Sequence, residues 1–405
     1  MKNLAIIIPT LQGGGAERVV SILTRELINR YNVYILVFDS SNIAYDYSGE
    51  LITVDIAASQ NFIMKLYNFF LRFWKIRKLK KELSIDVSIS FLGSANILNI
   101  MSKQNDKTIV SVRSMPSKAK SNLYTKLDHL TIKYLYSRSD KIIAISEGVY
   151  NDLISNFGIK PNSIEFIYNP ITLDGLEQEN VEESGKQKKR SEFKIVTAGR
   201  LSDAKGQWHL IRAMKRVLIK VPEAKLDILG EGELRSYLQE LIDNLKINDS
   251  VKLIGHKKNP FEYYTNSDVF VFTSLHEGFG NVILEAMACN MPVISTDCET
   301  GPREIISPNT KRNEPIKEPE ISDFGILVPV CDGKKYGFSE PLTEEEIIIA
   351  NNIINLYKNP SLRRSLAING KKRVAEFSSK IIAEKWIFQI ELDEDMGDKN
   401  DKSNV

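Results

Sequence analysis

Cysteine, histidine and long hydrophobic runs are all scarce in this sequence of 405 residues. The three cysteines, Cys289, Cys298 and Cys331, are an odd number and lack the spacing of metal ligands. They argue against a disulfide scaffold and a zinc module, and they fit a reducing compartment. No apolar run reaches the roughly 18 residues that a membrane-spanning helix needs. The first run, Leu4–Ile8, is too short for the core of a signal peptide, so we expect a buried strand in a cytoplasmic protein.

Net charge is also nearly absent, since 54 Lys and Arg face 52 Asp and Glu, which gives no sign of extended nucleic-acid binding. The charge is nevertheless uneven: residues 1–160 hold 21 basic and 13 acidic residues. Between Phe62 and Leu83, seven Lys and Arg alternate with aromatic and aliphatic residues, and Glu82 is the only acid. This pattern favours a helix in a membrane interface whose basic groups reach anionic headgroups. The alternative is a packing helix with a solvated basic edge.

Short β-branched runs alternate with segments of helical periodicity along most of the chain, whose length suits two domains. Near-continuous apolar runs are typical of strands covered on both faces, and their alternation with helices predicts open parallel sheets. The strands expected in the first half are Leu4–Ile8, Val33–Val37, Leu51–Val54, Val87–Ser90, Thr108–Val112, Lys141–Ile145 and Ile164–Ile167. Those expected in the second half are Phe193–Ala198, Lys225–Leu229, Val251–Ile254, Val269–Phe272, Pro292–Ser295 and Gly325–Val328.

A polar, highly charged stretch separates the two series of strands and is typical of a linker. We therefore predict an α/β protein with two Rossmann-like domains facing across a cleft. The first domain spans residues 1–175, the linker 176–192 and the second domain 193–380, and a terminal helix and disordered tail follow over 381–405.

Three glycines, Gly13, Gly14 and Gly15, follow the first strand and precede a helix. Glycines at such a turn let a ligand approach the backbone, and a helix N-terminus attracts negative charge. A tight strand-to-helix turn is the structural alternative. The spacing is not G-x-G-x-x-G, so a dinucleotide fingerprint is absent.

Two cations, Arg200 and Lys205, follow the first strand of the second domain. Open α/β sheets bind ligands at the carboxyl ends of their strands. Arg as a fork and Lys as a point charge suit a diphosphate there, although each could instead belong to an ordinary surface ion pair.

The segment after Val269–Phe272 is the most informative part of the sequence. Glu277 lies in a loop and can accept sugar hydroxyls, and Glu285 lies one helical turn beyond Asn281, where it can accept hydrogen bonds from a ribose diol. Free backbone N–H groups at the helix start could hold a phosphate. The residues of this loop and helix start are Glu277, Gly278, Phe279, Gly280, Asn281 and Val282. Isolated from this setting, the two glutamates would be read as surface carboxylates.

An ordered set of motifs resembles the family 4 retaining glycosyltransferases, which have the GT-B fold. "EGFGNVILEAMACNMPVI" is similar to the E-x7-E motif of that family. "GGGAER", "IIAISEGV", "IYNPI", "AGRLSDAKGQ" and "ILGEGELR" match it in the same order. The resemblance covers about residues 3 to 380.

The resemblance implies that the second domain binds a nucleotide-sugar donor and the first an acceptor. Arg200 and Lys205 would hold the diphosphate, Glu285 the ribose, and Glu277 with the Phe279–Asn281 backbone the transferred sugar. Gly14 and Gly15 would approach the donor phosphates. His256 would lie near the base, with a solvated loop histidine as the alternative. No metal or other cofactor is implied.

The first domain departs from the family at one point. Family members often carry a histidine after a first-domain strand, whereas Arg113 follows Thr108–Val112 here. Arg113 could stabilise the charge of the departing phosphate, or that contact comes from elsewhere. His129 is a poor substitute because it lies in a helical pattern, where a structural histidine is expected. Asn169 could touch the cleft.

Further along, "TGPREII" resembles a segment of polysaccharide-assembly members of the family. Arg303 and Glu304 could cap the sugar end of the cleft, or simply form the first turn of a helix after Pro302.

Taken together, the resemblance implies a retaining glycosyltransferase in surface polysaccharide (lipopolysaccharide or capsule) biosynthesis. The donor would be a nucleotide-diphosphate sugar, such as a UDP-linked hexose or N-acetylhexosamine. The acceptor would be a polyprenyl-diphosphate-linked glycan, which places the enzyme peripherally on the inner face of the plasma membrane. The alternatives are a non-catalytic nucleotide-sugar-binding protein and a GT-B nucleotide-sugar epimerase.

Overall fold

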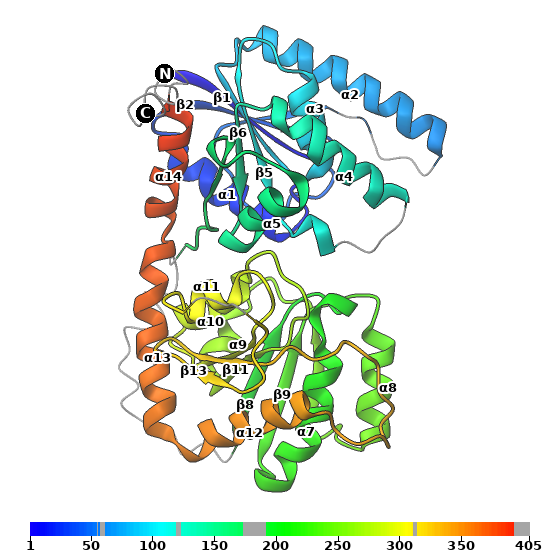
Figure 1. Ribbon diagram of the computed structural model, residues 1–405, viewed down its shortest axis with the longest axis vertical. Coiled ribbons are helices and arrows are strands. Elements are labelled where there is room, and N and C mark those ends of the chain that lie inside the picture. Colours follow the sequence, from blue (N-terminus) through cyan, green and yellow to red (C-terminus); the bar gives the residue numbers. More distant parts are fainter. Residues whose placement is uncertain (55, 57–60, 119–122, 173–191, 311–313, 393–405) are drawn as a thin grey trace. The chain divides into compact units, whose positions relative to one another are not determined.

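The computed structural model describes residues 1–54, 56, 61–118, 123–172, 192–310 and 314–392. The chain folds as two compact units: unit 1 contains Met1–Thr172 and Phe377–Val405, and unit 2 contains Leu173–Glu376 (Figure 1). Each unit is built on a sheet of parallel strands, so the predicted α/β class with two Rossmann-like domains is confirmed. Most of the expected linker and all of the expected tail, residues 393–405, lie outside the described residues.

Unit 1 has a seven-stranded parallel sheet in the order β3-β2-β1-β4-β5-β6-β7. The near-continuous apolar run of β1 is explained by cores on both faces of the sheet. Leu4, Ile6 and Ile8 enter one core, and Ala5 and Ile7 enter the other. The strands are β1 (Lys2–Ile8), β2 (Tyr31–Val37), β3 (Glu50–Thr53), β4 (Val87–Phe91), β5 (Lys107–Val112), β6 (Lys141–Ala144) and β7 (Ile164–Phe166).

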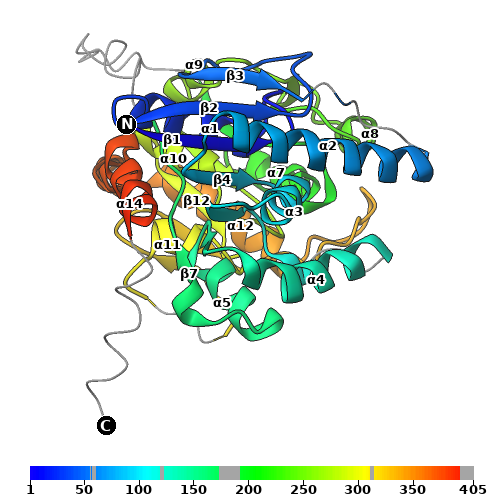
Figure 2. The same cartoon turned by 90° about the horizontal axis from the view of Figure 1, so that it is seen from above.

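The helices of unit 1 cover both faces of this sheet. They are α1 (Gly15–Leu27), α2 (Phe62–Glu82), α3 (Gly93–Met101), α4 (Leu123–Leu135), α5 (Glu147–Phe157) and α14 (Ser379–Glu391). One core is shared with α1 and α14, and the opposite core with α2 and α3. The last helix thus belongs to the first unit, where it lies beside α1 (Figures 1 and 2). Trp386 of α14 packs on Phe91, with ring centroids 5.7 Å apart.

Helix α2 is the predicted basic-aromatic helix, and its cations do not all face outward as expected. Lys75 donates to the carbonyl oxygen of Val54 at 2.7 Å, and Arg77 donates to that of Lys103 at 3.2 Å. Arg72 similarly donates to the carbonyl of Ile56. The exposed side of α2 keeps Lys65, Lys78 and Lys81. It also carries large apolar side chains: Ile63, Met64, Leu66, Tyr67, Phe70, Leu71 and Trp74.

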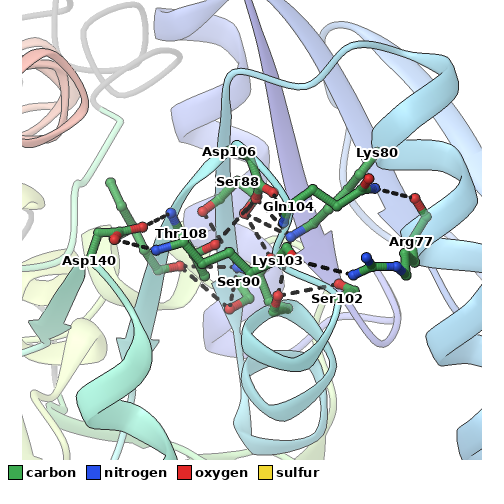
Figure 3. Close-up of polar contacts among 12 residues, drawn as sticks. Arg77, Lys80, Ser88, Ser90, Ser102, Lys103, Gln104, Asp106, Thr108 and Asp140 are labelled. Atoms are coloured by element: carbon green, nitrogen blue, oxygen red, sulfur yellow. Dashed lines mark hydrogen bonds and ion pairs between the residues drawn. The ribbon is translucent and has the colours of Figure 1, made fainter.

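A fourth cation of α2, Lys80, is completely buried and forms the centre of a polar network (Figure 3). Its ammonium pairs with Asp106 at 2.8 Å, and Ser88 donates to the same carboxylate oxygen at 2.6 Å. Burial lowers the pKa of Lys80. Burial alone would raise the pKa of Asp106, but Lys80 together with the hydrogen bonds from Ser88 and the Gln104 backbone lowers it. The short hydrogen bonds favour the ionised pair, and this pair fixes which face of α2 is turned to the sheet. Partnered buried charges of this kind tolerate the loss of one member poorly.

Unit 2 has a second seven-stranded sheet, in the order β10-β9-β8-β11-β12-β14-β13. Only the short edge strand β13 runs antiparallel to its neighbour among these pairs. The strands are β8 (Phe193–Ala198), β9 (Ala224–Leu229), β10 (Val251–Gly255), β11 (Val269–Phe272), β12 (Val293–Thr296), β13 (Glu320–Ile321) and β14 (Ile326–Val328). The helices are α7 (Gln207–Lys220), α8 (Arg235–Leu245), α9 (Phe261–Thr265), α10 (Asn281–Ala288), α11 (Pro302–Ile306), α12 (Glu344–Lys358) and α13 (Pro360–Val374).

The strand order reverses once in each sheet, between β1 and β4 in unit 1 and between β8 and β11 in unit 2. Ligands of open α/β sheets bind beyond the carboxyl ends of the strands at such a reversal. The loops after β8 and β11 are therefore the first place to look for a site in unit 2, and those after β1 and β4 in unit 1.

Among the described helices, none has both the length and the apolar character needed to cross a bilayer.

Candidate active site

The loop after β8 carries Lys205 to the end of β11. Gly206 makes this possible, because it has a φ of +59° and a Cβ there would lie 2.5 Å from the carbonyl oxygen of Thr273. The backbone N–H of Leu275 donates to the carbonyl of Ala204 at 2.8 Å and ties the two loops together. Lys205 is thereby held by the backbone, with its ammonium 5.2 Å from the centre of the Phe272 ring.

Glu277 is the partner that this arrangement gives to Lys205. Its carboxylate forms an ion pair with the ammonium and accepts a hydrogen bond from the Ser274 hydroxyl at 2.7 Å. The side chains of Lys205 and Glu277 are 22% and 11% exposed, so both charges are largely shielded but still reachable. The structure thus joins one predicted cation and one predicted carboxylate at the reversal point of the sheet.

The loop after β12 supports Glu277 from behind. The hydroxyl of Thr300 donates to the carbonyl oxygen of Glu277. Gly301 has a φ of +87°, and a Cβ there would lie 2.0 Å from the carbonyl oxygen of Phe279. Only glycine allows this close approach, so the Glu277–Gly280 loop is clamped between two others.

Helix α10 begins directly after this loop. Gly280 is its N-cap residue with a φ of +98°, and Asn281 and Val282 form its first turn. Glu285, on the next turn, is a buried carboxylate that accepts a hydrogen bond from the Tyr264 hydroxyl at 3.4 Å. The first N–H groups of a helix lack intrahelical acceptors and carry a partial positive charge, so α10 adds an anion-attracting element.

Two other predicted donor residues are placed apart from this pair. Arg200 is exposed and forms a surface ion pair with Glu233 at 3.3 Å, and His256 is exposed just after β10. Within the described residues, no hydrogen bond or ion pair joins either of them to Lys205 or Glu277.

In unit 1, the glycine turn after β1 is occupied by a carboxylate of its own helix. Gly14 is the N-cap residue of α1 and Gly15 its first residue. A Cβ on Gly14 would lie 2.3 Å from one carboxylate oxygen of Glu17, and the other oxygen of that carboxylate accepts a hydrogen bond from the Thr10 hydroxyl at 3.3 Å. The nearer oxygen is the end of a flexible side chain, and Gly14 has a φ of −84°, so neither the contact nor the backbone conformation requires glycine at this position.

The remaining candidates of unit 1 lie at the end of β5 and in α4. Arg113 follows β5 and donates to the side-chain oxygen of Asn169, which is buried. His129 contacts the carbonyl oxygen of Pro116 at 3.0 Å and packs edge-on against Phe157. His129 is therefore a satisfied structural histidine, as the sequence indicated.

Arg303 and Glu304 make local structural contacts. Arg303 pairs with the buried Asp297 at 2.9 Å and with Glu320 at 2.9 Å. Glu304 accepts a hydrogen bond from the backbone N–H of Gly301 at 3.2 Å and caps α11. These contacts favour the helix-turn alternative over a contact with the sugar.

Comparisons with known proteins show the family of this chain. The model of the family described as "Glycosyltransferase Family 4" matches residues 13–174, and that of "Glycosyl transferases group 1" matches residues 178–324. An uncharacterised glycosyltransferase of Methanocaldococcus jannaschii is 36% identical over 82% of this chain and 86% of its own. The chain belongs to glycosyltransferase family 4.

A Campylobacter jejuni relative of this glycosyltransferase has a descriptive name. N-acetylgalactosamine-N,N'-diacetylbacillosaminyl-diphospho-undecaprenol 4-alpha-N-acetylgalactosaminyltransferase is 31% identical over 94% of this chain and 100% of its own. Among solved structures, that of Anabaena HepE in complex with UDP and glucose has a TM-score of 0.73 at 16% identity, covering 96% of this chain and 99% of that one. That likeness shows the shared GT-B fold.

Sequence reasoning missed several residues that shape the site of the glycosyltransferase. Ser274 orients Glu277, and Gly206 lets the Lys205 loop reach it. Ser274 could have been suspected as a small polar residue at the end of a buried strand. Gly206 carried no such signal, because the constraint on it comes from the neighbouring strand and not from its own segment.

Within the described residues, no group of His, Cys, Asp and Glu could hold a metal ion. The three cysteines are buried and are not disulfide-bonded.

Proposed function

We propose that this glycosyltransferase moves a sugar, with retention of anomeric configuration, from a nucleotide-diphosphate sugar to a lipid-linked glycan. The observation that carries the proposal is the Lys205–Glu277 ion pair at the reversal point of the unit 2 sheet. An ammonium for a diphosphate and a carboxylate for sugar hydroxyls stand side by side there.

Lys205 would bind Glu277 and the donor diphosphate at the same time. An ammonium has three N–H donors, so one can remain on Glu277 while the others hold oxygens of the donor diphosphate. Glu277, which Ser274 keeps in place, would then accept hydrogen bonds from hydroxyls of the transferred sugar. One cation would thus link the position of the sugar to the position of its leaving group.

Other residues of unit 2 would make the remaining contacts with the donor. Glu285 would accept hydrogen bonds from the ribose, and His256 would lie near the base. The backbone of Phe279, Gly280, Asn281 and Val282 at the start of α10 would face the sugar and phosphates. Arg200 would leave its exposed partner Glu233 to bind the diphosphate; a surface ion pair of this kind is worth at most about 1 kcal/mol, so the exchange is inexpensive.

The chemistry we propose is front-face displacement without a covalent intermediate. The acceptor hydroxyl oxygen bonds to the anomeric carbon as the bond to the β-phosphate oxygen breaks. The departing phosphate takes the hydroxyl proton, so charge and atoms balance. Lys205, Arg200 and the start of α10 stabilise the leaving diphosphate. From unit 1, Arg113 would add positive charge, and the Gly14–Gly15 turn would approach the donor phosphates; no metal ion is needed for this charge balance.

The name of the Campylobacter jejuni relative supports a lipid-linked acceptor, because the substrate in that name is a sugar chain on diphospho-undecaprenol. A capsular polysaccharide glycosyltransferase of Staphylococcus aureus, 32% identical over 60% of this chain, agrees with a role in surface polysaccharide assembly. We accordingly place the protein in the cytoplasm, peripherally on the inner face of the plasma membrane.

Helix α2 would provide the membrane contact. Its exposed face includes Trp74 at 63% and Tyr67 at 56% exposure, and amphipathic rings of this kind favour the headgroup region. Because four cations of α2 are bound to the protein itself, we expect apolar insertion to contribute more than attraction to anionic lipids.

A donor screen with membrane lipid extract, read by mass spectrometry, tests the activity. We expect a lipid-linked product heavier by one sugar residue and free nucleoside diphosphate. Donor binding without a new glycosidic bond would identify a non-catalytic binding protein, and a donor converted to its epimer without any acceptor would identify an epimerase.

Vesicle co-sedimentation at rising salt tests the membrane contact. Trp74→Ala should weaken binding several-fold, while the control Phe388→Ala, which removes an aromatic 61% exposed on α14, should not. If the wild type does not bind anionic vesicles at low salt, the membrane part of the proposal is wrong and only soluble acceptors remain.

A further inference from the structure

Arg113 has an unusual environment for a largely enclosed arginine of this chain. It follows β5, and its guanidinium lies over the ring of Phe91, 5.5 Å from the ring centre. One terminal nitrogen donates to the side-chain oxygen of Asn169, and the other reaches the Ser111 hydroxyl only at 3.5 Å. Its Nε is buried and has no hydrogen-bond partner.

The charge of Arg113 is poorly compensated as a result. Within the described residues no carboxylate forms an ion pair with it, and Glu17 acts only from a distance. Burial lowers the pKa of Arg113 to about 9, with Glu17 opposing the shift. An arginine does not lose its proton under such conditions, so the guanidinium stays charged at a position where burial disfavours its charge.

Three other enclosed arginines of the chain show the contrast, whereas Arg72 is, like Arg113, bound to a neutral oxygen, the carbonyl of Ile56. Arg212 pairs with Glu346 at 2.9 Å, Arg303 with Asp297 at 2.9 Å, and Arg373 with Glu376. Each of them is neutralised by a carboxylate of the protein, as buried charges usually are. Arg113 is held instead by the neutral amide of Asn169, which orients the fork and leaves its charge available.

Arg113 also lies where a residue that binds a ligand is expected in an open α/β sheet. It lies at the carboxyl end of β5, and its aromatic support, Phe91, ends β4, one of the two strands at which the order of the unit 1 sheet reverses. A planar guanidinium matches the oxygens of a phosphate better than a single ammonium does.

We propose that Arg113 and Asn169 form a diphosphate-recognition site of unit 1, in which Arg113 contacts the phosphate and Asn169 acts as a positioning residue. The proposal rests on the proposed transferase function. It adds to that function the group that Arg113 binds, a diphosphate, and the role of the Asn169 amide, which holds Arg113 without neutralising its charge. The diphosphate belongs either to the nucleotide donor or to the lipid-linked acceptor, since both carry the same group.

The test is calorimetric titration of the full chain with inorganic pyrophosphate and with UDP, each alone, and with pyrophosphate after saturation with UDP. The variants are Arg113→Gln, Asn169→Asp and the control Arg138→Gln, which removes an exposed arginine of the same unit. Melting temperatures establish that each variant is folded, and Arg113→Lys serves as a second variant should the glutamine prove unstable.

We expect Arg113→Gln to weaken anion binding about 10- to 100-fold, the usual effect of losing a charge-assisted hydrogen bond. If the group belongs to the acceptor, pyrophosphate binds the UDP-saturated wild type and the variant loses this binding alone. If it belongs to the donor, the variant binds UDP itself more weakly. Arg138→Gln should match the wild type in both titrations.

Asn169→Asp separates positioning from a structural role. The aspartate would give Arg113 a carboxylate partner, so anion affinity should fall about 10-fold while the melting temperature is kept or raised. A folded Asn169→Asp variant with unchanged pyrophosphate and UDP affinities would overturn the role of Asn169. A folded Arg113→Gln variant with wild-type affinity for both ligands would overturn the whole proposal. Neither result depends on catalysis, so both differ from a failure of the wild type to transfer sugar.

Discussion

Replacing Lys205 should lower kcat strongly while leaving the fold largely intact. Its ammonium is the only cation paired with Glu277 among the described residues. An ammonium and a phosphate charge of the leaving diphosphate about 4 Å apart would attract each other by about 4 kcal/mol at an effective dielectric constant of 20. Because the Lys205 side chain is 22% exposed, solvent reduces this value, and we expect Lys205→Ala to lower kcat by about 10²-fold, the lower end of the usual cost of such a group.

The substitution has a second effect, on stability, that the assay must separate. Without Lys205, the carboxylate of Glu277 is left shielded and without its cation, which should lower the free energy of unfolding by about 1 to 2 kcal/mol, less than for a fully buried pair. The double variant Lys205→Met/Glu277→Gln removes both charges and should recover most of that stability. It should not recover transfer, because the leaving diphosphate still lacks its cation.

The assay is sugar transfer at saturating donor and acceptor, with denaturant unfolding measured on the same samples. Lys194→Ala is the matched control, since Lys194 lies near the other end of the same strand, β8, and has only a distant partner, Glu192 at 3.9 Å. The control should keep wild-type kcat. A folded Lys205→Ala variant with wild-type turnover would refute the role given to this lysine.

Four further substitutions have defined outcomes. Gly206→Ala should lower kcat and destabilise the protein by about 1 to 3 kcal/mol, since a Cβ at a φ of +59° would meet the Thr273 carbonyl; unfolding and transfer assays check this, and an unchanged variant would contradict the loop geometry. Glu285→Gln should raise the donor KM about 10-fold through a weaker ribose contact, with steady-state kinetics as the measurement and an unchanged KM as the contrary result. Lys80→Met should cost about 3 to 5 kcal/mol of stability because it leaves Asp106 buried and unpaired, measured by urea unfolding. Since the pKa of Asp106 is lowered on folding, its ionised form stabilises the wild type above the unfolded pKa of about 3.9 and this contribution is lost as the pH falls through the folded value; Asp106→Asn should flatten that acid dependence.

Much of the fold could be predicted because the strands are covered on both faces. All the expected strands occur, to within two residues at either end. The two-residue strand β13, Glu320–Ile321, was missed because it is too short to show a period. The sequence also gave no sign that α14 packs on the sheet of unit 1, since helical periodicity reports an apolar face and not its partner.

The candidate site was predictable in part for the same reason. Sequence position placed Lys205 and Glu277 in loops after two strands of one sheet, and the structure shows that these strands, β8 and β11, are neighbours and that the two side chains form an ion pair. Arg200 and His256 follow strands of the same sheet, yet each is exposed. The direction of a loop side chain depends on contacts made by other segments, and composition does not contain that information. The inward cations of α2 were missed on the same ground.

A crystal structure of the protein with UDP bound would test the donor site in unit 2 most directly. We expect density for the diphosphate within hydrogen-bond distance of the Lys205 ammonium and density for the ribose at the Glu285 carboxylate. A nucleotide bound at any other part of the chain, with the Lys205–Glu277 pair untouched, would contradict this expectation.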